Sequence, residues 1–306
     1  MNAFDAVVER AKSNKSPKRA AVAGAEDEHA IEAVFAAADA GIIRPVLVGD
    51  ALRITEIIKA LGISANSPDI IDVGSAEPDA CAQRAVEVVS EGRADFLIKG
   101  RLETKDILKP VVDHKNNLRL DDAGSVKHVM SHLAFFQIPE REKLLVVTDG
   151  GMVMYPDLEA KKAILVNAVR TLRKMGIDRP KIAVLCAVER VNEKMPETLD
   201  ARALAEAAAC GEIADCVVEG PISYDIAMSA ACARIKGYNS PWCGSFDVLL
   251  VPNITAGNIL GKSLAITAHA TMAGVVVGAK VPIVVTSRSA DASEKFYSIA
   301  LCASMS

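Results

Sequence analysis

Two apolar, strand-like runs near the C-terminus end in residues that could bind an anion. VLLV is followed by PN and the helical pattern ITAGNILGKSLAI, and PIVV is followed by TSRS, which places Ser287 and Arg288 just past a strand. A strand end that opens a helix can hold an anion on backbone N–H groups. The guanidinium of Arg288 suits phosphate, and Ser287 could stabilise a developing oxyanion. The ordinary alternative is a serine N-cap on a solvated helix.

The first of these junctions also matches a relaxed phosphate-loop pattern, with Ala256 where the first glycine belongs and GKS around Lys262. A functional loop needs glycines so that successive N–H groups can wrap a phosphate, and it needs an aspartate for Mg²⁺. Here the loop is PNITAGN, and the next strand, VPIVVTSRS, ends without an aspartate. We therefore favour a phosphate-facing lysine outside a nucleotide hydrolase, with an exposed lysine at a helix start as the alternative.

Other strand-like runs also end in charged or glycine residues. DFLI is followed by Lys99-Gly100-Arg101, where two cations flank one glycine and could capture an anion, although a charged surface turn is equally ordinary. The run LLVVT leads into Asp149 and two glycines, and this residue is interpreted as a turn aspartate.

Two further groups of polar residues have competing interpretations. Tyr224 and Asp225 follow the strand exit EGPIS and are expected in the first turn of a helix. His128 and His132 would share one face of a helix, because they are spaced i, i+4. No glutamate completes a zinc motif, so we interpret them as structural or interface histidines.

Composition narrows the class of protein. The 306 residues are 51% hydrophobic and carry a net charge of −4 with no basic stripe, so nucleic acid is not an expected partner. The seven cysteines include no C-x-x-C pair and predict reduced thiols. The N-terminus does not resemble a signal peptide, and no run reaches the roughly 18–20 apolar residues of a membrane span. We expect a soluble, cytoplasmic protein that does not bind a membrane.

Short β-branched runs alternate with helical patterns along most of the chain. This alternation predicts parallel sheets with helices on both faces, an α/β fold. The predicted crossover helices include 28–40, 78–91 and 158–175. The predicted strands are 20–23, 45–48, 70–73, 95–98, 144–148, 182–187, 216–218, 248–251 and 283–286.

The length and the number of strands predict two domains. The alternation is interrupted within 116–139, which suggests a first domain of residues 1–138, joined again by residues 287–306, and a second domain of residues 139–286. Two such domains are expected to leave a cleft for a small molecule. Ligands of these folds bind beyond the carboxyl ends of the strands, which selects the residues described above.

The order of the segments along the chain is more specific than any one of them. AVAGAEDEHAIEAV, IKGRLETKDILKPVVDH, VTDGGMVMYPDLEAKKAI, VLCAVERVNEKMPETLDA, VVEGPISYDIAMS, VLLVPNITAGNILGKSL and VPIVVTSRSA together closely resemble the phosphate acetyl/butyryltransferase family, most of all its butyryl branch. The resemblance runs from about Lys18 to the C-terminus. It implies two α/β domains around a central cleft, as in isocitrate and isopropylmalate dehydrogenases, and a homodimer or higher homo-oligomer.

The family's activity is to interconvert acyl-CoA and phosphate with acyl phosphate and CoA, without an organic cofactor or metal. On this resemblance, Ser287 and Arg288 would stabilise the oxyanion and bind phosphate. The other matched residues, which would line the phosphate, acyl and CoA site, are Gly220, Pro221, Tyr224, Asp225, Pro252, Asn253, Gly257, Asn258 and Lys262.

Two positions depart from the acetyl branch. Where that branch has an aspartate seven residues after the serine, this chain has Glu294, with Asp291 one turn earlier, so either carboxylate could be the base for the CoA thiol. Lys99 replaces a small hydroxyl residue. The alternatives to a phosphate acyltransferase are a nucleotide hydrolase and a non-catalytic protein that binds CoA or another phosphometabolite.

Overall fold

The computed structural model describes residues 3–64, 68–74, 78–120, 128–287 and 290–306. The chain forms two compact units, residues 1–121 with 273–306 and residues 122–272. These limits are offset from the domain limits expected at 138/139 and 286/287, and the predicted domain division stays a prediction. Within the described residues, no helix has both the length and the apolar character needed to cross a membrane.

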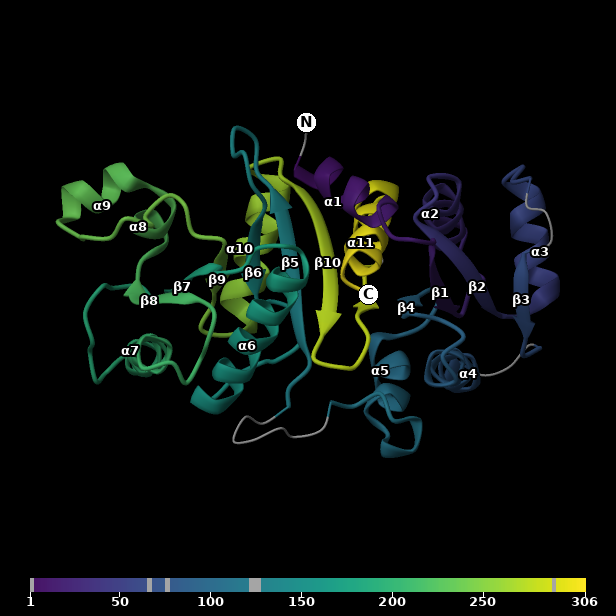
Figure 1. Ribbon diagram of the computed structural model, residues 1–306, viewed down its shortest axis with the longest axis horizontal. Helices are drawn as coiled ribbons and strands as arrows, with labels where there is room; N and C mark the ends of the chain where they lie inside the picture. Colours follow the sequence, from purple (N-terminus) through teal and green to yellow (C-terminus); the bar gives the residue numbers. More distant parts are fainter. Residues whose placement is uncertain (1–2, 65–67, 75–77, 121–127, 288–289) are drawn as a thin grey trace. The chain divides into compact units, whose positions relative to one another are not determined.

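The first unit is built on a mostly parallel set of strands in the order β3-β2-β1-β4-β11-β10 (Figure 1). β1 pairs in parallel with β2 and β4, β2 with β3, and β4 with β11, whereas β10 and β11 are antiparallel. The strands are β1 (Lys18–Ala23), β2 (Ile43–Gly49), β3 (Asp69–Asp72), β4 (Phe96–Lys99), β10 (Thr271–Val277) and β11 (Ile283–Val284).

Helices cover the strands of the first unit, so its central strands are buried on both faces. In β1 the four residues Ala20 to Ala23 have no exposed surface, as expected for a parallel strand between two helical layers. The C-terminal helix α11 packs on α1 and α2. The helices are α1 (Ala3–Lys12), α2 (Glu28–Asp39), α3 (Ala51–Ala60), α4 (Pro78–Ser90), α5 (Thr104–Val112) and α11 (Ala292–Met305), with a short 3-10 helix η1 (His114–Asn116).

The second unit has the strand order β5-β6-β9-β7-β8. Only β5 and β6 are antiparallel among these pairs; β6, β9, β7 and β8 run in parallel. The strands are β5 (Ser131–Gln137), β6 (Leu145–Thr148), β7 (Lys181–Leu185), β8 (Val217–Ile222) and β9 (Val248–Leu250). The helices are α6 (Leu158–Lys174), α7 (Pro196–Ala209), α8 (Tyr224–Met228), α9 (Ala230–Lys236) and α10 (Ile254–Ile266).

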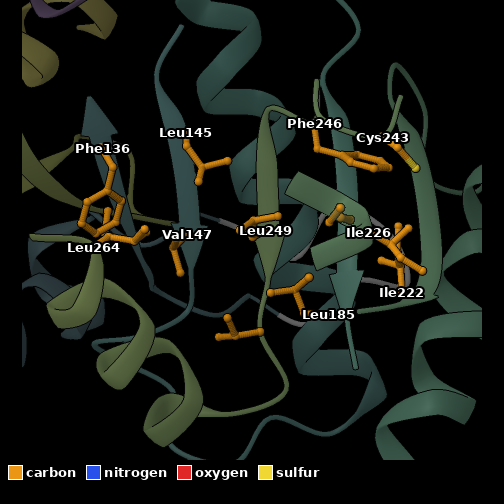
Figure 2. Close-up of a cluster of buried hydrophobic side chains, with 14 of the residues drawn as sticks. Phe136, Leu145, Val147, Leu185, Ile222, Ile226, Cys243, Phe246, Leu249 and Leu264 are labelled. Carbon is orange, nitrogen blue, oxygen red and sulfur yellow. The ribbon is translucent and has the colours of Figure 1, made fainter. Parts of the chain in front are cut away.

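The core of the second unit joins its strands to helices α8 and α10. Phe136, Leu145, Val147 and Leu249 come from the strands, and Leu264 comes from α10 (Figure 2). Each fully buried side chain of this size stabilises the fold by about 1.5–3 kcal/mol relative to an exposed one. The core therefore holds α10 against the strands of its own unit.

All nine predicted strands overlap strands of the structure, but the alternation did not predict β5 and β10. Both belong to antiparallel pairs, which need no crossover helix and so leave no strand–helix rhythm. His132 lies in β5 and His128 lies outside any helix, so the two histidines do not share a helix face.

Candidate functional site

An open pocket of about 990 Å³ lies at the ends of β1, β4 and β11 in the first unit. It brings together residues from four separate parts of the sequence, and the predicted residues Lys99, Gly100, Arg101 and Ser287 all line it. The described residues that line it are Asp27, His29, Pro78, Asp79, Lys99, Gly100, Arg101, Leu102, Glu103, Lys105, Asp106, Thr286, Ser287 and Lys295.

Two backbone hydrogen bonds lock the ends of β1 and β4 together beside this pocket. Gly100 N donates to Ala23 O at 2.9 Å, and Arg101 N donates to Gly24 O at 2.7 Å. A Cβ on Gly100 would lie 2.1 Å from Gly24 O, and the φ of Gly24 is +67°, so both positions require glycine. The glycine between the two cations is therefore structural, and it sets where Lys99 and Arg101 leave the backbone.

The ammonium of Lys99 is held at this turn. Its Nζ donates to Leu102 O at 3.0 Å and to Gly100 O at 3.4 Å. Arg101 and Lys105 are exposed at the same pocket, and Lys105 forms an ion pair with Glu103 at 2.9 Å. The hydrogen bond that Lys105 donates to Glu103 raises the pKa of Lys105. These cations can bind phosphate groups by charge-assisted hydrogen bonds.

Two helices begin at the pocket with capping residues that line it. Asp27 caps α2 by accepting a hydrogen bond from Ala30 N at 2.6 Å. Glu103 and Asp106 form a capping box at the start of α5, in which Glu103 N donates to Asp106 at 3.1 Å. Helix N-termini carry partial positive charge, which the capping carboxylates of Asp27, Glu103 and Asp106 offset at this pocket.

The first turn of α11 carries the two predicted bases, and their environments differ. Asp291 caps the helix, accepting hydrogen bonds from Glu294 N at 2.7 Å and Ser293 Oγ at 2.8 Å. The bond from Glu294 N, followed by that from Ser293, lowers the pKa of Asp291.

Glu294 is half-buried and has the opposite shift. Burial raises its pKa to about 7, the negative charge of Asp291 adds to the rise, and Lys295 opposes it. A group with a pKa near neutrality can both accept and donate a proton at physiological pH. The side chain of Asp291 is used as a cap, and the choice between the two carboxylates as the base stays a prediction.

The remaining residues of this region are Ser287, Arg288 and Lys295. Ser287 is exposed at the pocket, and its carbonyl accepts a hydrogen bond from Ala290 N at 3.1 Å. Arg288 lies outside the described residues, so its predicted role in phosphate binding stays a prediction. Lys295 was not among the residues selected from the sequence, although it follows Glu294 directly and lines the pocket.

The predicted residues of β8 and α8 lie in the second unit. A Cβ on Gly220 would lie 2.8 Å from the Cβ of Val184, so this glycine is needed where β8 packs on β7. It is joined to Pro221 by a cis peptide bond. As expected, Tyr224 and Asp225 lie in the first turn of α8, where Tyr224 is 39% exposed.

The carboxylate of Asp225 already has partners in its own unit. It accepts a hydrogen bond from Ser223 Oγ at 2.7 Å and forms an ion pair with Lys236 at 3.0 Å. These two contacts, the hydrogen bond first, lower the pKa of Asp225. Lys236 also pairs with Glu189 at 3.2 Å, which ties α9 to the loop after β7. No sequence motif pointed to Lys236, so the sequence alone could not have selected it.

The predicted residues of α10 have different surroundings. Asn253 is the N-cap of the helix and accepts a hydrogen bond from Ala256 N at 3.0 Å. Asn258 and Lys262 are exposed on the helix. Lys262 lies in the second half of α10, so the backbone N–H groups of GKS belong to the helix and cannot cradle a phosphate. This geometry counts against a nucleotide hydrolase.

Asp149 is a turn aspartate, as predicted. It is buried, and it accepts backbone hydrogen bonds from Gly151 at 2.8 Å, Met152 at 2.7 Å, Val153 at 3.3 Å and His132 at 3.1 Å. The described residues include no group of three or more His, Cys, Asp or Glu side chains that could hold a metal ion.

Comparison with known proteins shows one consistent relationship. The family model described as phosphate acetyl/butaryl transferase matches residues 79–303. The chain is 41% identical to the phosphate acetyltransferase of Thermotoga maritima, over 94% of each chain. It is 38% identical to the phosphate butyryltransferase of Clostridium acetobutylicum, over 99% of this chain and 98% of the relative.

Solved structures give the same result. The branched-chain phosphotransacylase of Enterococcus faecalis V583 superposes with a TM-score of 0.81 at 29% identity, over 94% of this chain and 98% of the other. The 4-hydroxythreonine-4-phosphate dehydrogenase of Klebsiella pneumoniae, at 14% identity, has a TM-score of 0.59 over 94% of this chain and 98% of the other. This second likeness concerns the fold alone.

Proposed function

The chain belongs to the phosphate acetyl/butyryltransferase family, and we propose that it transfers a short-chain acyl group between CoA and phosphate at the pocket beside β1, β4 and β11. The observation that carries this assignment to the pocket is the meeting of Lys99 and Ser287 at one surface, with Lys295 from the first turn of α11. Inorganic phosphate and CoA are both anions, which explains a cluster of cations in a protein of net charge −4.

The chemistry needs a deprotonated thiol, a stabilised oxyanion and a held phosphate. In the direction that forms acyl-CoA, the thiol sulfur attacks the acyl carbon of the acyl phosphate, a C–S bond forms and the C–O bond to phosphate breaks. Glu294 takes the thiol proton and can return it to the leaving phosphate. Ser287 would donate to the oxygen that becomes negative, and Lys99 with Lys295 would hold the phosphate.

The predicted residues of the second unit keep the roles that the family resemblance implies. On the family resemblance, Lys262 would lie near the phosphate and Asn258 belongs to the same matched segment. Gly220, Pro221, Tyr224 and Asp225 would line the acyl and phosphate pocket. Asn253 would act through its capping of α10. Support for Lys262 and Asn258 is their exposure, which leaves them accessible to a substrate.

The finer predictions of organisation are part of the same proposal. They are an isocitrate or isopropylmalate dehydrogenase-like arrangement of two domains, a homodimer or higher homo-oligomer, a cytoplasmic location and no organic cofactor. The fold likeness to a 4-hydroxythreonine-4-phosphate dehydrogenase is compatible with the dehydrogenase-like fold. Light scattering of the purified protein would measure the oligomeric state.

A thiol-release assay tests the function directly. Purified protein is mixed with acetyl-, propionyl-, butyryl- or isobutyryl-CoA, with and without phosphate, and free CoA is measured with a thiol reagent. We expect release that requires phosphate, and the acyl-CoA with the highest kcat/KM identifies the substrate. Absence of phosphate-dependent release from all four would refute the assignment; CoA binding without turnover would indicate the non-catalytic alternative.

A further inference from the structure

The N-terminal helix α1 lies along the C-terminal helix α11, although the two are at opposite ends of the chain (Figure 1). Phe4 of α1 has no exposed surface and stacks on Tyr297 of α11, with ring centroids 4.6 Å apart and planes 15° from parallel. Just past α1, Asn14 Nδ2 donates to Ala303 O of α11 at 3.0 Å. The aromatic stack and the amide hydrogen bond hold α11 at two points along its length.

A second contact fixes the same turn of α11 from β10. The fully buried Ser298 donates through Oγ to Glu294 O at 2.7 Å and accepts a hydrogen bond from Gly274 N at 2.9 Å. Tyr297 and Ser298 follow Glu294 by three and four residues, which places them one helical turn away from it. The backbone of Glu294 is thus linked to β10, and the side chain one turn further is linked to α1.

These contacts act on the part of α11 that carries the proposed proton-transfer group. The end of a helix frays unless other elements hold it, and a base must be held within hydrogen-bond reach of its substrate. Among the described residues, the charged groups that act on Glu294 are Asp291 and Lys295, at the start of the same helix. From α1, Asp5 acts on Tyr297 and, after burial, contributes to raising its pKa.

We propose that α1 is a clamp that positions the first turn of α11, and that Phe4 is a positioning residue for acyl transfer, acting through Tyr297 on Glu294. The inference rests on the proposed function of Glu294. The clamp comes from a segment outside residues 79–303, the part of the chain that the family model matches.

The test compares Phe4→Ala with Ile54→Ala in the full-length protein. Ile54 is a fully buried residue of α3, and its truncation provides a control for a general loss of stability. We expect Phe4→Ala to lower kcat at least tenfold while the KM for phosphate changes less than about threefold, since a positioning residue does not bind substrate. Phe4→Leu, which keeps apolar volume without the ring, should lie between wild type and Phe4→Ala.

The pH dependence separates positioning from stability. Loosening α11 admits water to Glu294, so its pKa falls toward the ordinary value and the acid-side midpoint of kcat moves to lower pH in Phe4→Ala. Ile54→Ala should have a melting temperature similar to that of Phe4→Ala but should keep the wild-type acid-side midpoint of kcat. Equal kcat and equal midpoints in the two variants would overturn the clamp.

Two controls keep the outcome decisive. If Phe4→Ala does not fold, Tyr297→Leu removes the stack from the half-exposed side, and the same two readouts apply. Wild-type protein without phosphate-dependent thiol release would refute the proposed function itself. An active wild type with an unchanged Phe4→Ala or Tyr297→Leu would refute only the clamp.

Discussion

The parallel strands of the two units end in different surroundings. In the first unit, the ends of β1, β4 and β11 border an open pocket of about 990 Å³, and Lys99 and Lys295 line it. In the second unit, polar groups near the strand ends bond to their own chain: Asp149 to four backbone N–H groups, Asn253 to the start of α10, and Asp225 to Lys236.

This difference shows that a strand end is only the first requirement for a site. Both sets of strand ends obey the rule that ligands bind beyond the carboxyl edge of a parallel sheet. Binding also needs open space beside the donors, which the pocket of the first unit provides, although Lys99 and Lys295 also donate hydrogen bonds to backbone carbonyls. We therefore propose that proton transfer and phosphate capture take place in the first unit, and the contribution of the exposed Lys262 of the second unit needs measurement.

The largest expected effect follows from replacing Glu294. Glu294→Gln removes the proton acceptor and should lower kcat for acyl-CoA formation by about 10²–10⁴-fold. In wild type, this rate should rise as pH passes through about 7, because the base form of Glu294 accumulates above its pKa. The variant should lose that rise. A pH–rate profile of Glu294→Gln that matches wild type would exclude Glu294, and Glu294→Asp, with the same charge, serves as control.

A change at Asp149 tests whether the second set of strand ends is structural. Asp149→Ala leaves several buried N–H donors without an acceptor and should lower the free energy of unfolding by about 2–4 kcal/mol. Chemical denaturation measures this loss, and Asp149→Asn, which keeps one carbonyl oxygen, should lose less. Loss of kcat at unchanged stability would instead indicate a chemical role for Asp149 and would contradict the difference drawn between the strand ends of the two units.

Matched lysine substitutions compare the two units directly. Lys99→Met should raise the KM for phosphate about tenfold, equivalent to about 1.4 kcal/mol. Lys262→Met is the matched variant in the second unit, and the family resemblance predicts that it also raises the KM for phosphate. A raised KM in both variants would support a role in phosphate binding for both lysines, whereas an effect of Lys99→Met alone would support phosphate binding by the first unit. Steady-state kinetics with varied phosphate distinguishes these outcomes.

The smallest expected effect separates capping from charge at Asp291. Asp291→Ala loses the N-cap of α11 and should destabilise the protein by about 1 kcal/mol, whereas Asp291→Asn keeps a capping oxygen. Both remove the negative charge that raises the pKa of Glu294, so both should move the acid-side midpoint of kcat to lower pH. A large loss of kcat in Asp291→Asn, with the midpoint unchanged, would make Asp291 the base instead.

Much of the fold could be predicted because parallel strands and their helices leave regular local patterns. All nine predicted strands overlap strands of the structure, and α2, α4 and α6 match predicted crossover helices closely. The antiparallel strands β5 and β10 were not predicted, because their partners lie beside them without a helix between. The phosphate-loop pattern was misleading for a related reason: only the helix bounds show that Lys262 lies inside α10.

The sequence by itself determined the family, the α/β class and the strand ends where polar residues gather, since residue order and local periodicity are properties of the chain. The tertiary structure decided which of those residues have space and which have partners. It separated Glu294, half-buried with a pKa of about 7, from Asp291, which caps α11. It also brought Lys295 to the pocket of Lys99 and Phe4 against Tyr297. Burial and contacts between distant segments set these properties, and neither can be read from spacing along the chain.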